Sequence, residues 1–199
     1  MNTEKLLHDL SKEKVDTWFD LGLLIDKVKE DGYSFSGSTV KRESDFIRNA
    51  PAIRAKSFNQ FKKNLSGKGM AFITYYYSVD GVTVEIQKYA KAFKSFLPDM
   101  PIHFISGSFL PEADCFIDKS YKRHTFKEIN GFDSWSLYED FFFTQLQRGS
   151  KEYNELIVKF WNEVLLIIKN LGTCIETNNI ELLYLINVCS NPGNVSLSL

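Results

Sequence analysis

The sequence predicts an α/β protein: a Rossmann-like parallel sheet with flanking helices, preceded by a helical N-terminal extension. Three observations carry this prediction. Short apolar runs rich in β-forming residues begin near Met70, Pro101 and Ile180, which is typical of strands buried on both faces. The longer segments between these runs repeat apolar residues at helical spacing. Residues 1–67 contain helical patterns and turns but no convincing strand. We therefore predict an extension over 1–67 and one Rossmann-like domain over 68–199.

Two helical segments are expected in the extension. The first has an apolar face formed by Val15, Trp18, Phe19, Ile25 and Val28. The second, which is richer in basic residues, carries Phe58, Phe61 and Leu65 at helical spacing. Each pattern predicts an amphipathic helix with a solvated polar face.

A βαβ unit is predicted next. A strand over 70–77 is followed by Asp80 and Gly81, and then by a helix whose stripe is Ile86, Tyr89, Ala90, Phe93 and Leu97. Pro98 ends this helix, and a second strand ends at Gly107. Because parallel strands joined by a helix cross over right-handedly, both strands should lie in one parallel sheet.

The second half of the domain is less regular. Residues 111–149 are aromatic and rich in turn signals, and they give no clear element. A long helix then shows one apolar face from Tyr153 to Leu171, and Gly172 is its expected end. A third buried strand is predicted over 180–188, followed by a loop and by a helix that starts near Val195.

Three loops are predicted at the carboxyl ends of these strands, where open α/β sheets bind ligands. They are residues 78–81, 106–108 and 187–194. Gly81 permits close backbone approach or a positive φ, and the helix that follows offers free N–H groups to a phosphate or a carboxylate. The other interpretation of Asp80 and Gly81 is an ordinary tight turn in which Asp80 caps the helix.

Composition excludes several classes of function. Lys and Arg number 24 against 25 Asp and Glu, so we expect no nucleic-acid partner. The polar N-terminus and the absence of a long apolar run predict no signal peptide and no transmembrane segment, hence a cytoplasmic protein. The cysteines, Cys115, Cys174 and Cys189, are widely spaced, and we therefore expect neither a disulfide framework nor a metal site.

Groups suited to catalysis are sparse. His103 lies in a predicted strand and is expected in the core, whereas His124 lies in a basic run and is expected to be exposed. Cys189 is the thiol best placed to act as a nucleophile, because it follows a strand. A small buried thiol is the favoured interpretation of Cys189, and an α/β enzyme that uses it is kept as a third hypothesis.

The order of three motifs resembles a known family. The segments "ITYYYSVDGVTVEIQKYAKAF", "PIHFISG" and "IELLYLINVCSNPGNVSLSL" look like the N-terminal domain of nucleotide-sugar-dependent glycosyltransferases of the group 1 type, which have the GT-B fold. The resemblance covers about residues 68–199. It implies two Rossmann-like domains that face a cleft, with the acceptor on the N-terminal domain and most of the nucleotide-sugar on the C-terminal domain.

The resemblance also implies roles for particular residues. Ser78, Asp80 and Gly81 would border the cleft near the donor phosphates. The acceptor side would be lined by Gly107, Asn187, Asn191, Gly193 and Asn194. The donor is a substrate, the acceptor a glycan or a small molecule. No permanently bound cofactor and no metal is implied, and the resemblance points to no catalytic residue in this chain.

The sequence departs from the family pattern. The first loop reads Val-Asp-Gly-Val where many relatives have paired glycines, and the last strand lacks the His that many relatives carry. The donor-binding domain has no counterpart in these residues. We therefore expect a truncated GT-B half that transfers no sugar alone, and that forms a homo-oligomer or needs a missing C-terminal domain.

A second class of function remains open. The chain is alternatively a non-enzymatic Rossmann-like binding or interaction module, which uses the aromatic helix at 15–28 and the basic segment at 41–63 to dock a partner. Saturable binding of a nucleotide-sugar or acceptor favours the glycosyltransferase half. A stable protein complex without nucleotide affinity favours the module.

Overall fold

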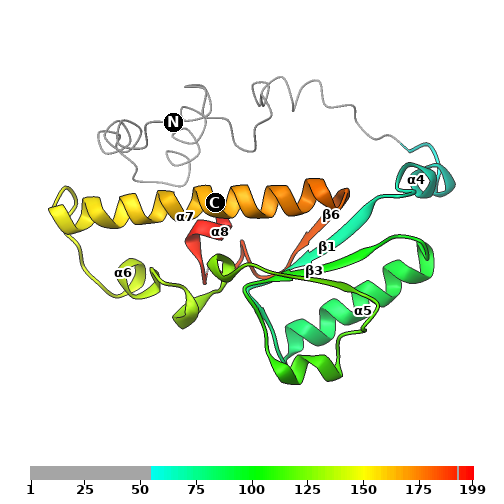
Figure 1. Cartoon of the computed structure of the whole chain (residues 1–199), viewed down its shortest axis with the longest axis horizontal. Coiled ribbons are helices and arrows are strands. Elements are labelled where there is room, and N and C mark those ends of the chain that lie inside the picture. The colour runs from blue at the N-terminus through cyan, green and yellow to red at the C-terminus, as the bar shows by residue number, and fades with distance from the viewer. Residues whose placement is uncertain (1–54, 192) are drawn as a thin grey trace.

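The computed structural model describes residues 55–191 and 193–199. The predicted helix at 15–28 and the basic residues before position 55 lie outside the described residues. In the described part, a four-stranded sheet has the order β5-β3-β1-β6, and every neighbouring pair is parallel. Helix α5 covers one face of this sheet and helix α7 the other (Figure 1). The predicted α/β class with a parallel sheet and flanking helices is confirmed.

The predicted βαβ unit is present. Its elements are β1 (Gly69–Ile73), α5 (Gly81–Phe96) and β3 (Ile102–Ser106). All five residues of each strand are buried, as expected for strands covered on both faces. Successive side chains point to opposite faces, so Phe72 and Phe104 pack beneath α5 while Ala71 and Ile105 pack beneath α7.

Both predicted strands of this unit are interrupted. After β1 the chain bends at Thr74 and Tyr75 and resumes as β2 (Tyr76–Tyr77), and after β3 it bends at Gly107 and resumes as β4 (Ser108–Phe109). β2 and β4 pair in a separate parallel ribbon. Because the two chains bend together, Tyr77 becomes fully buried between the stacked rings of Phe104 and Phe109.

One strand was not predicted. After a 3-10 turn (Pro111–Cys115) the chain forms β5 (Lys122–Thr125), which lies at one edge of the sheet. Lysine and arginine are usual on exposed strand edges because charge discourages further pairing. No element was predicted for residues 111–149, so the basic run at 119–124 was not recognised as an edge strand.

The region from β5 to α7 is irregular, as expected. It contains two 3-10 turns and a short helix, which are η2 (Lys127–Ile129), η3 (Phe132–Ser134) and α6 (Tyr138–Phe142). Trp135 and Leu137 are buried from this region against α7. Its backbone also lies over the carboxyl edge of the sheet, where it helps to build the candidate site.

Helix α7 (Lys151–Thr177) is longer than predicted. The Ser150 side chain caps its first turn by accepting a hydrogen bond from the Tyr153 N–H at 3.1 Å. Gly172 does not end the helix, since a glycine inside a helix costs only about 1 kcal/mol and neighbouring Leu171 and Cys174 pack on the sheet. The helix ends instead at Asn178, and Asn179 follows with φ 52°.

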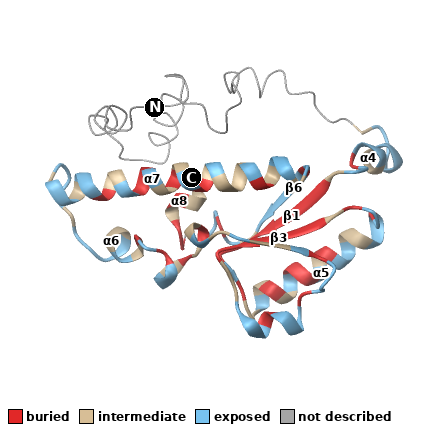
Figure 2. Ribbon diagram, in the orientation of Figure 1, coloured by how far each residue is buried: buried red, intermediate tan, exposed pale blue. Residues whose placement is uncertain are grey.

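Strand β6 (Ile180–Leu185) completes the sheet, and its burial differs from the prediction. Ile180 is buried, but Leu183 and Leu185 are 46% and 49% exposed. β6 is an edge strand with β1 as its neighbour in the sheet, so it is not the strand buried on both faces that its apolar composition suggested. Figure 2 shows the contrast between β6 and the buried strands β1 and β3. The loop after β6 leads to α8 (Val195–Ser198), where a helix was expected.

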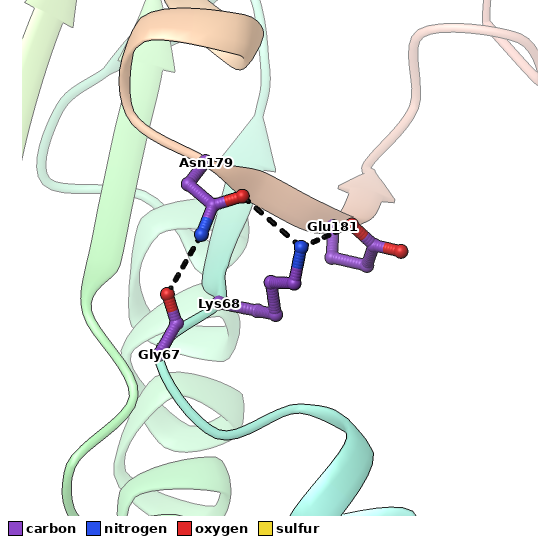
Figure 3. A network of polar contacts seen from close by, with 4 residues as sticks. All are labelled: Gly67, Lys68, Asn179 and Glu181. Carbon is purple, nitrogen blue, oxygen red and sulfur yellow. Dashed lines mark hydrogen bonds and ion pairs between the residues drawn. The ribbon is translucent and has the colours of Figure 1, made fainter.

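A polar network fastens the amino ends of β1 and β6 (Figure 3). The Lys68 ammonium donates to Asn179 Oδ1 at 3.2 Å and lies 3.6 Å from a Glu181 carboxylate oxygen. Asn179 Nδ2 donates to the Gly67 carbonyl at 2.9 Å. This network lies at the amino ends of the strands, opposite the carboxyl edge where open α/β sheets bind ligands. It holds β1 and β6 together.

The predicted boundary at residue 67 follows a short helix, α4 (Phe58–Asn64). Phe61 packs against the same core as α5, and Leu65 is buried in it. The Phe58 ring meets Phe96 edge-on. The last part of the predicted extension is therefore packed on the domain.

Candidate functional site

The order of the strands locates the ligand edge of the sheet. From β1 the chain proceeds outward through β3 to β5, and α7 then returns it to the other side of β1 as β6. The direction of winding thus reverses between β1 and β6. In open α/β sheets the crevice for ligands lies at the carboxyl ends of the two strands at such a reversal. Here those ends lead into residues 74–80 and 186–194.

Tyr75 occupies this position. Its side chain is 3% exposed, and its hydroxyl lies 3.0 Å from the Val188 carbonyl oxygen and 2.9 Å from that of Asn191. The Gly193 N–H donates to the same hydroxyl at 2.9 Å. Burial raises the pKa of the Tyr75 phenol, so the group remains a neutral donor and acceptor. Tyr75 therefore ties the loop after β6 to the end of β1.

Asn194 ties the same loop to the segment after β5. It is fully buried, and its side-chain amide donates to the Glu128 carbonyl at 2.9 Å and to the Asn130 carbonyl at 2.7 Å. Its Oδ1 accepts from the Leu197 N–H at 3.0 Å and so caps α8. The polar atoms of a buried amide need hydrogen-bond partners. The partners of the Asn194 side chain connect the loop after β6 to the segment after β5 and to α8.

Two of the predicted glycines lie where side chains do not fit. A Cβ at Gly193 would meet the Phe132 ring at 2.9 Å, and the Phe132 N–H donates to the Gly193 carbonyl at 2.7 Å. A Cβ at Gly107 would collide with the backbone and side chain of Asn130. Glycine is thus required by close approach at both positions. We call Tyr75, Asn130, Phe132, Gly193 and Asn194 the carboxyl-edge cluster.

The predicted acceptor-side residues divide into two groups. Gly107, Gly193 and Asn194 are buried in or against the carboxyl-edge cluster. Asn187 and Asn191 are exposed on the loop that the cluster holds, and Asn187 has the left-handed φ of 61°. The buried residues are thus placed to hold the loop, while the two exposed asparagines are the ones that can reach a ligand.

The predicted donor-side residues form a separate group at the start of α5. Asp80 Oδ1 accepts from the Thr83 N–H at 2.7 Å, and Asp80 Oδ2 accepts from the Ser78 hydroxyl at 2.7 Å. The Ser78 N–H in turn donates to Thr83 Oγ1 at 3.1 Å. This is a helix cap, so the interpretation of Asp80 as a cap is confirmed.

Gly81 is not required by its backbone conformation. The positive-φ glycines of the described residues are Gly67 and Gly149, so the positive φ considered for Gly81 is wrong. A Cβ at Gly81 would find no atom within 4 Å. Gly81 is also exposed, which is compatible with close approach of a ligand to this residue.

Sequence reasoning missed Tyr75, Asn130 and Phe132. A tyrosine directly after a buried strand was a usable signal, because its hydroxyl needs a partner when the ring is buried. Phe132 gives no such signal. Its φ is 54°, which is unusual for a bulky residue, so the sequence does not predict this conformation and the surrounding structure must impose it. Asn130, followed by Gly131, is a turn signal in the sequence, and a turn signal does not predict its contact with Gly107.

The two histidines of the described residues lie away from this edge. His103 is fully buried in β3, and its Nδ1 lies 2.9 Å from Nε2 of His124 on β5. Burial, together with His124 and Lys122, lowers the pKa of His103 to about 4. The core interpretation of His103 is confirmed. His124 is half-buried against it, so the expectation that His124 would be exposed is wrong.

Other candidate groups give no second site. Cys189 is exposed and Cys174 is buried, so the expectation of a buried thiol at Cys189 is wrong. Between residues 55 and 199, position 192 aside, no three His, Cys, Asp or Glu side chains are grouped to hold a metal ion. Within the same part of the chain, no helix has the length and apolar character needed to cross a membrane.

Comparison with family models, with curated proteins and with solved structures found no match to this chain. The candidate site therefore rests on the geometry of the carboxyl edge.

Proposed function

We propose that this chain is the acceptor-side domain of a cytoplasmic, nucleotide-sugar-dependent glycosyltransferase of the GT-B type. The observation that carries the proposal is the strand order β5-β3-β1-β6. It puts the reversal point of the sheet at β1 and β6, and the loops that carry the family resemblance follow these two strands. The edge at which such sheets bind ligands is thus the edge where the resembling residues lie.

The acceptor would contact the exposed asparagines. The side chains of Asn187 and Asn191 make no hydrogen bond within the described residues. Each amide offers two donors and one acceptor oxygen, which suits the hydroxyl groups of a sugar. The loop that carries them is held by Tyr75 and Asn194, and a loop ordered in advance loses less entropy when it binds.

The donor diphosphate would lie near the start of α5. The N–H groups of Gly81 and Val82 precede the first capped N–H of this sixteen-residue helix, and helix N-termini favour anions. The Asp80 carboxylate already supplies negative charge there. We therefore assign most of the donor contacts, and the charges that stabilise the leaving diphosphate, to a second Rossmann-like domain that faces this edge.

Titration calorimetry of the full chain tests the acceptor assignment. The ligands are neutral monosaccharides and disaccharides, with uridine- and guanosine-diphosphate sugars as donors. We expect saturable acceptor binding that Asn191→Ala weakens and Asn154→Ala, an exposed asparagine on α7, leaves unchanged. Equal affinity of the two variants would contradict the assignment. Sugar transfer by residues 1–199 alone would contradict the assignment of the donor contacts to a second domain.

A binding module without catalysis is the second candidate. Two observations favour it: Tyr75 at the end of β1 is buried and its hydroxyl is bound to the loop after β6, and both oxygens of Asp80 are used within the chain. A stable complex with another protein, together with no response to any sugar or nucleotide-sugar in the same calorimetry, would favour this module.

A further inference from the structure

The two edges of the sheet differ in their protection against further pairing. The β5 edge carries Lys122 and Arg123, and charged side chains discourage the addition of another strand. The β6 edge instead exposes Leu183, Tyr184 and Leu185, by 46%, 37% and 49%. Figure 2 shows β6 as an exposed strand beside the buried β1. A long apolar edge of this kind is a template for pairing.

The backbone groups available for pairing follow from the bond to β1. The Ile186 N–H donates to the Ile73 carbonyl at 3.0 Å. Hydrogen-bonding directions alternate along a strand, so Tyr184, like Ile186, faces β1, and the register shift at Gly69 and Met70 lies at the other end of β6. The N–H and C=O groups of Leu183 and Leu185 therefore point away from the sheet.

The sequence of β6 is self-complementary about Tyr184. When residues 182–186 are read in both directions from Tyr184, each apolar residue meets another apolar residue. The matched pairs are Leu183 with Leu185 and Leu182 with Ile186, and the chain turns away from the strand at Asn187. We propose that β6 pairs antiparallel with β6 of a second copy of this chain, about a two-fold axis at Tyr184, so that one sheet continues through both copies.

This register agrees with the backbone directions. Leu183 of one copy and Leu185 of the other form a hydrogen-bonded pair, since the free N–H and C=O groups of both residues point outward. Tyr184 meets its own counterpart in a non-hydrogen-bonded pair, where the Cα atoms come within about 4.5 Å. Glu181, 3.6 Å from Lys68, lies outside the paired residues 182–186. An interface of two identical patches is what a two-fold dimer requires.

Other registers are less favourable. A two-fold axis at Leu183 also matches the outward-pointing groups, but it puts Glu181 against Leu185 and so desolvates a carboxylate beside an apolar side chain. The register centred on Tyr184 pairs only apolar residues, over 182–186, and leaves Glu181 outside the paired segment.

The first test measures the association state of the full chain by analytical ultracentrifugation over a range of concentrations. We expect a monomer–dimer equilibrium. Leu183→Lys should weaken dimerisation by roughly tenfold or more, because a lysine is then desolvated at the interface. Leu166→Lys is the matched control, since Leu166 is 45% exposed but lies on α7, and it should leave the equilibrium unchanged.

Disulfide trapping tests the register. With Cys115 and Cys189 replaced by serine, Tyr184→Cys should cross-link two copies on mild oxidation, because a Cα separation of about 4.5 Å permits a disulfide. Leu182→Cys should not cross-link, because in this register the two cysteines are about 14 Å apart. Hydrogen exchange should show protected Leu183 and Leu185 amides in the dimer.

Three results would overturn the proposal. One is a chain that is monomeric at every concentration, including a monomer with protected Leu183 and Leu185 amides, which would show that another segment or another polypeptide covers β6. The second is equal weakening by Leu183→Lys and Leu166→Lys, which would place the interface elsewhere. The third is cross-linking of Leu182→Cys as fast as that of Tyr184→Cys.

Discussion

At the scale of single residues, the Tyr75 hydroxyl holds the loop after β6 against the end of β1. This group accepts from the Gly193 N–H and donates to carbonyls of the loop after β6. Tyr75→Phe would leave the Gly193 N–H buried without its partner, which costs about 1–3 kcal/mol of the free energy of unfolding. Chemical denaturation measures this loss, and hydrogen exchange should become faster at Gly193.

Tyr121→Phe is the matched control for this prediction. Tyr121 is 7% exposed, and its hydroxyl makes no hydrogen bond within the described residues. Its removal should change the free energy of unfolding by much less. Equal losses for Tyr75→Phe and Tyr121→Phe would show that Tyr75 acts through its ring alone.

The buried histidine pair makes stability depend on pH. Burial, His124 and Lys122 lower the pKa of His103 to about 4 in the folded state, whereas an unfolded histidine titrates near 6.5. Between these values the unfolded chain binds more protons, so stability falls as the pH falls from about 6.5 to about 4. The loss should reach at most on the order of 3 kcal/mol.

Urea unfolding at pH 7 and pH 5 measures this dependence. The variant in which His103 and His124 are both replaced by leucine should lose less stability between the two pH values than the natural chain. The same loss in both proteins would show that carboxylates or other groups, and not the histidine pair, cause the acid sensitivity.

At the scale of elements, two substitutions at the start of α5 distinguish helix capping by Asp80 from a binding role of Gly81. Asp80→Ala removes the cap of this helix and should cost about 1 kcal/mol of stability. Gly81→Ala meets no atom within 4 Å and should leave stability unchanged or slightly raised, since alanine favours helix. Thermal unfolding measures both changes.

The same two variants bear on donor binding. If a diphosphate approaches the backbone at Gly81, the alanine methyl should weaken nucleotide-sugar binding in a protein that is at least as stable as the natural chain. Unchanged binding by Gly81→Ala would remove the donor role of this loop and leave Asp80 and Ser78 as a helix cap.

The helices and central strands could be predicted because each carries its own signal. The apolar stripe of α5 and that of α7 have helical period, and the continuous apolar run of β1 is typical of a central parallel strand. β5 was missed since its Lys122 and Arg123 look like loop residues. The exposure of β6 was missed for the opposite reason, because an apolar composition does not reveal whether a neighbouring strand is present.

The candidate site was only partly predictable. Gly107, Gly193 and Asn194 lie at the expected edge, but the residues that hold them in place, Tyr75 and Phe132, were not found. The partners of the Tyr75 hydroxyl are more than a hundred positions away in the chain, with Gly193 at a separation of 118 residues. Contacts at such separations follow from the fold and leave no local pattern.

At the scale of the whole molecule, the carboxyl edge of one parallel sheet brings together the loops after β1, β3 and β6 through the carboxyl-edge cluster. The far end of the same sheet is closed by the Lys68 network. This difference between the two ends supports the proposal that a ligand binds at the carboxyl edge. The β6 edge lies between the two ends, and no strand of the described residues pairs with its outer side, so the proposed dimer and the proposed ligand site would use different edges of the sheet.

A backbone amide chemical-shift titration of the full chain with sugar acceptors and nucleotide-sugars tests whether the carboxyl edge is the acceptor site. We expect saturable shifts concentrated in residues 187–194, with smaller shifts at 78–83. Saturable shifts confined to another surface, or no shift with any sugar or nucleotide-sugar, would contradict the assignment of the carboxyl edge as the acceptor site.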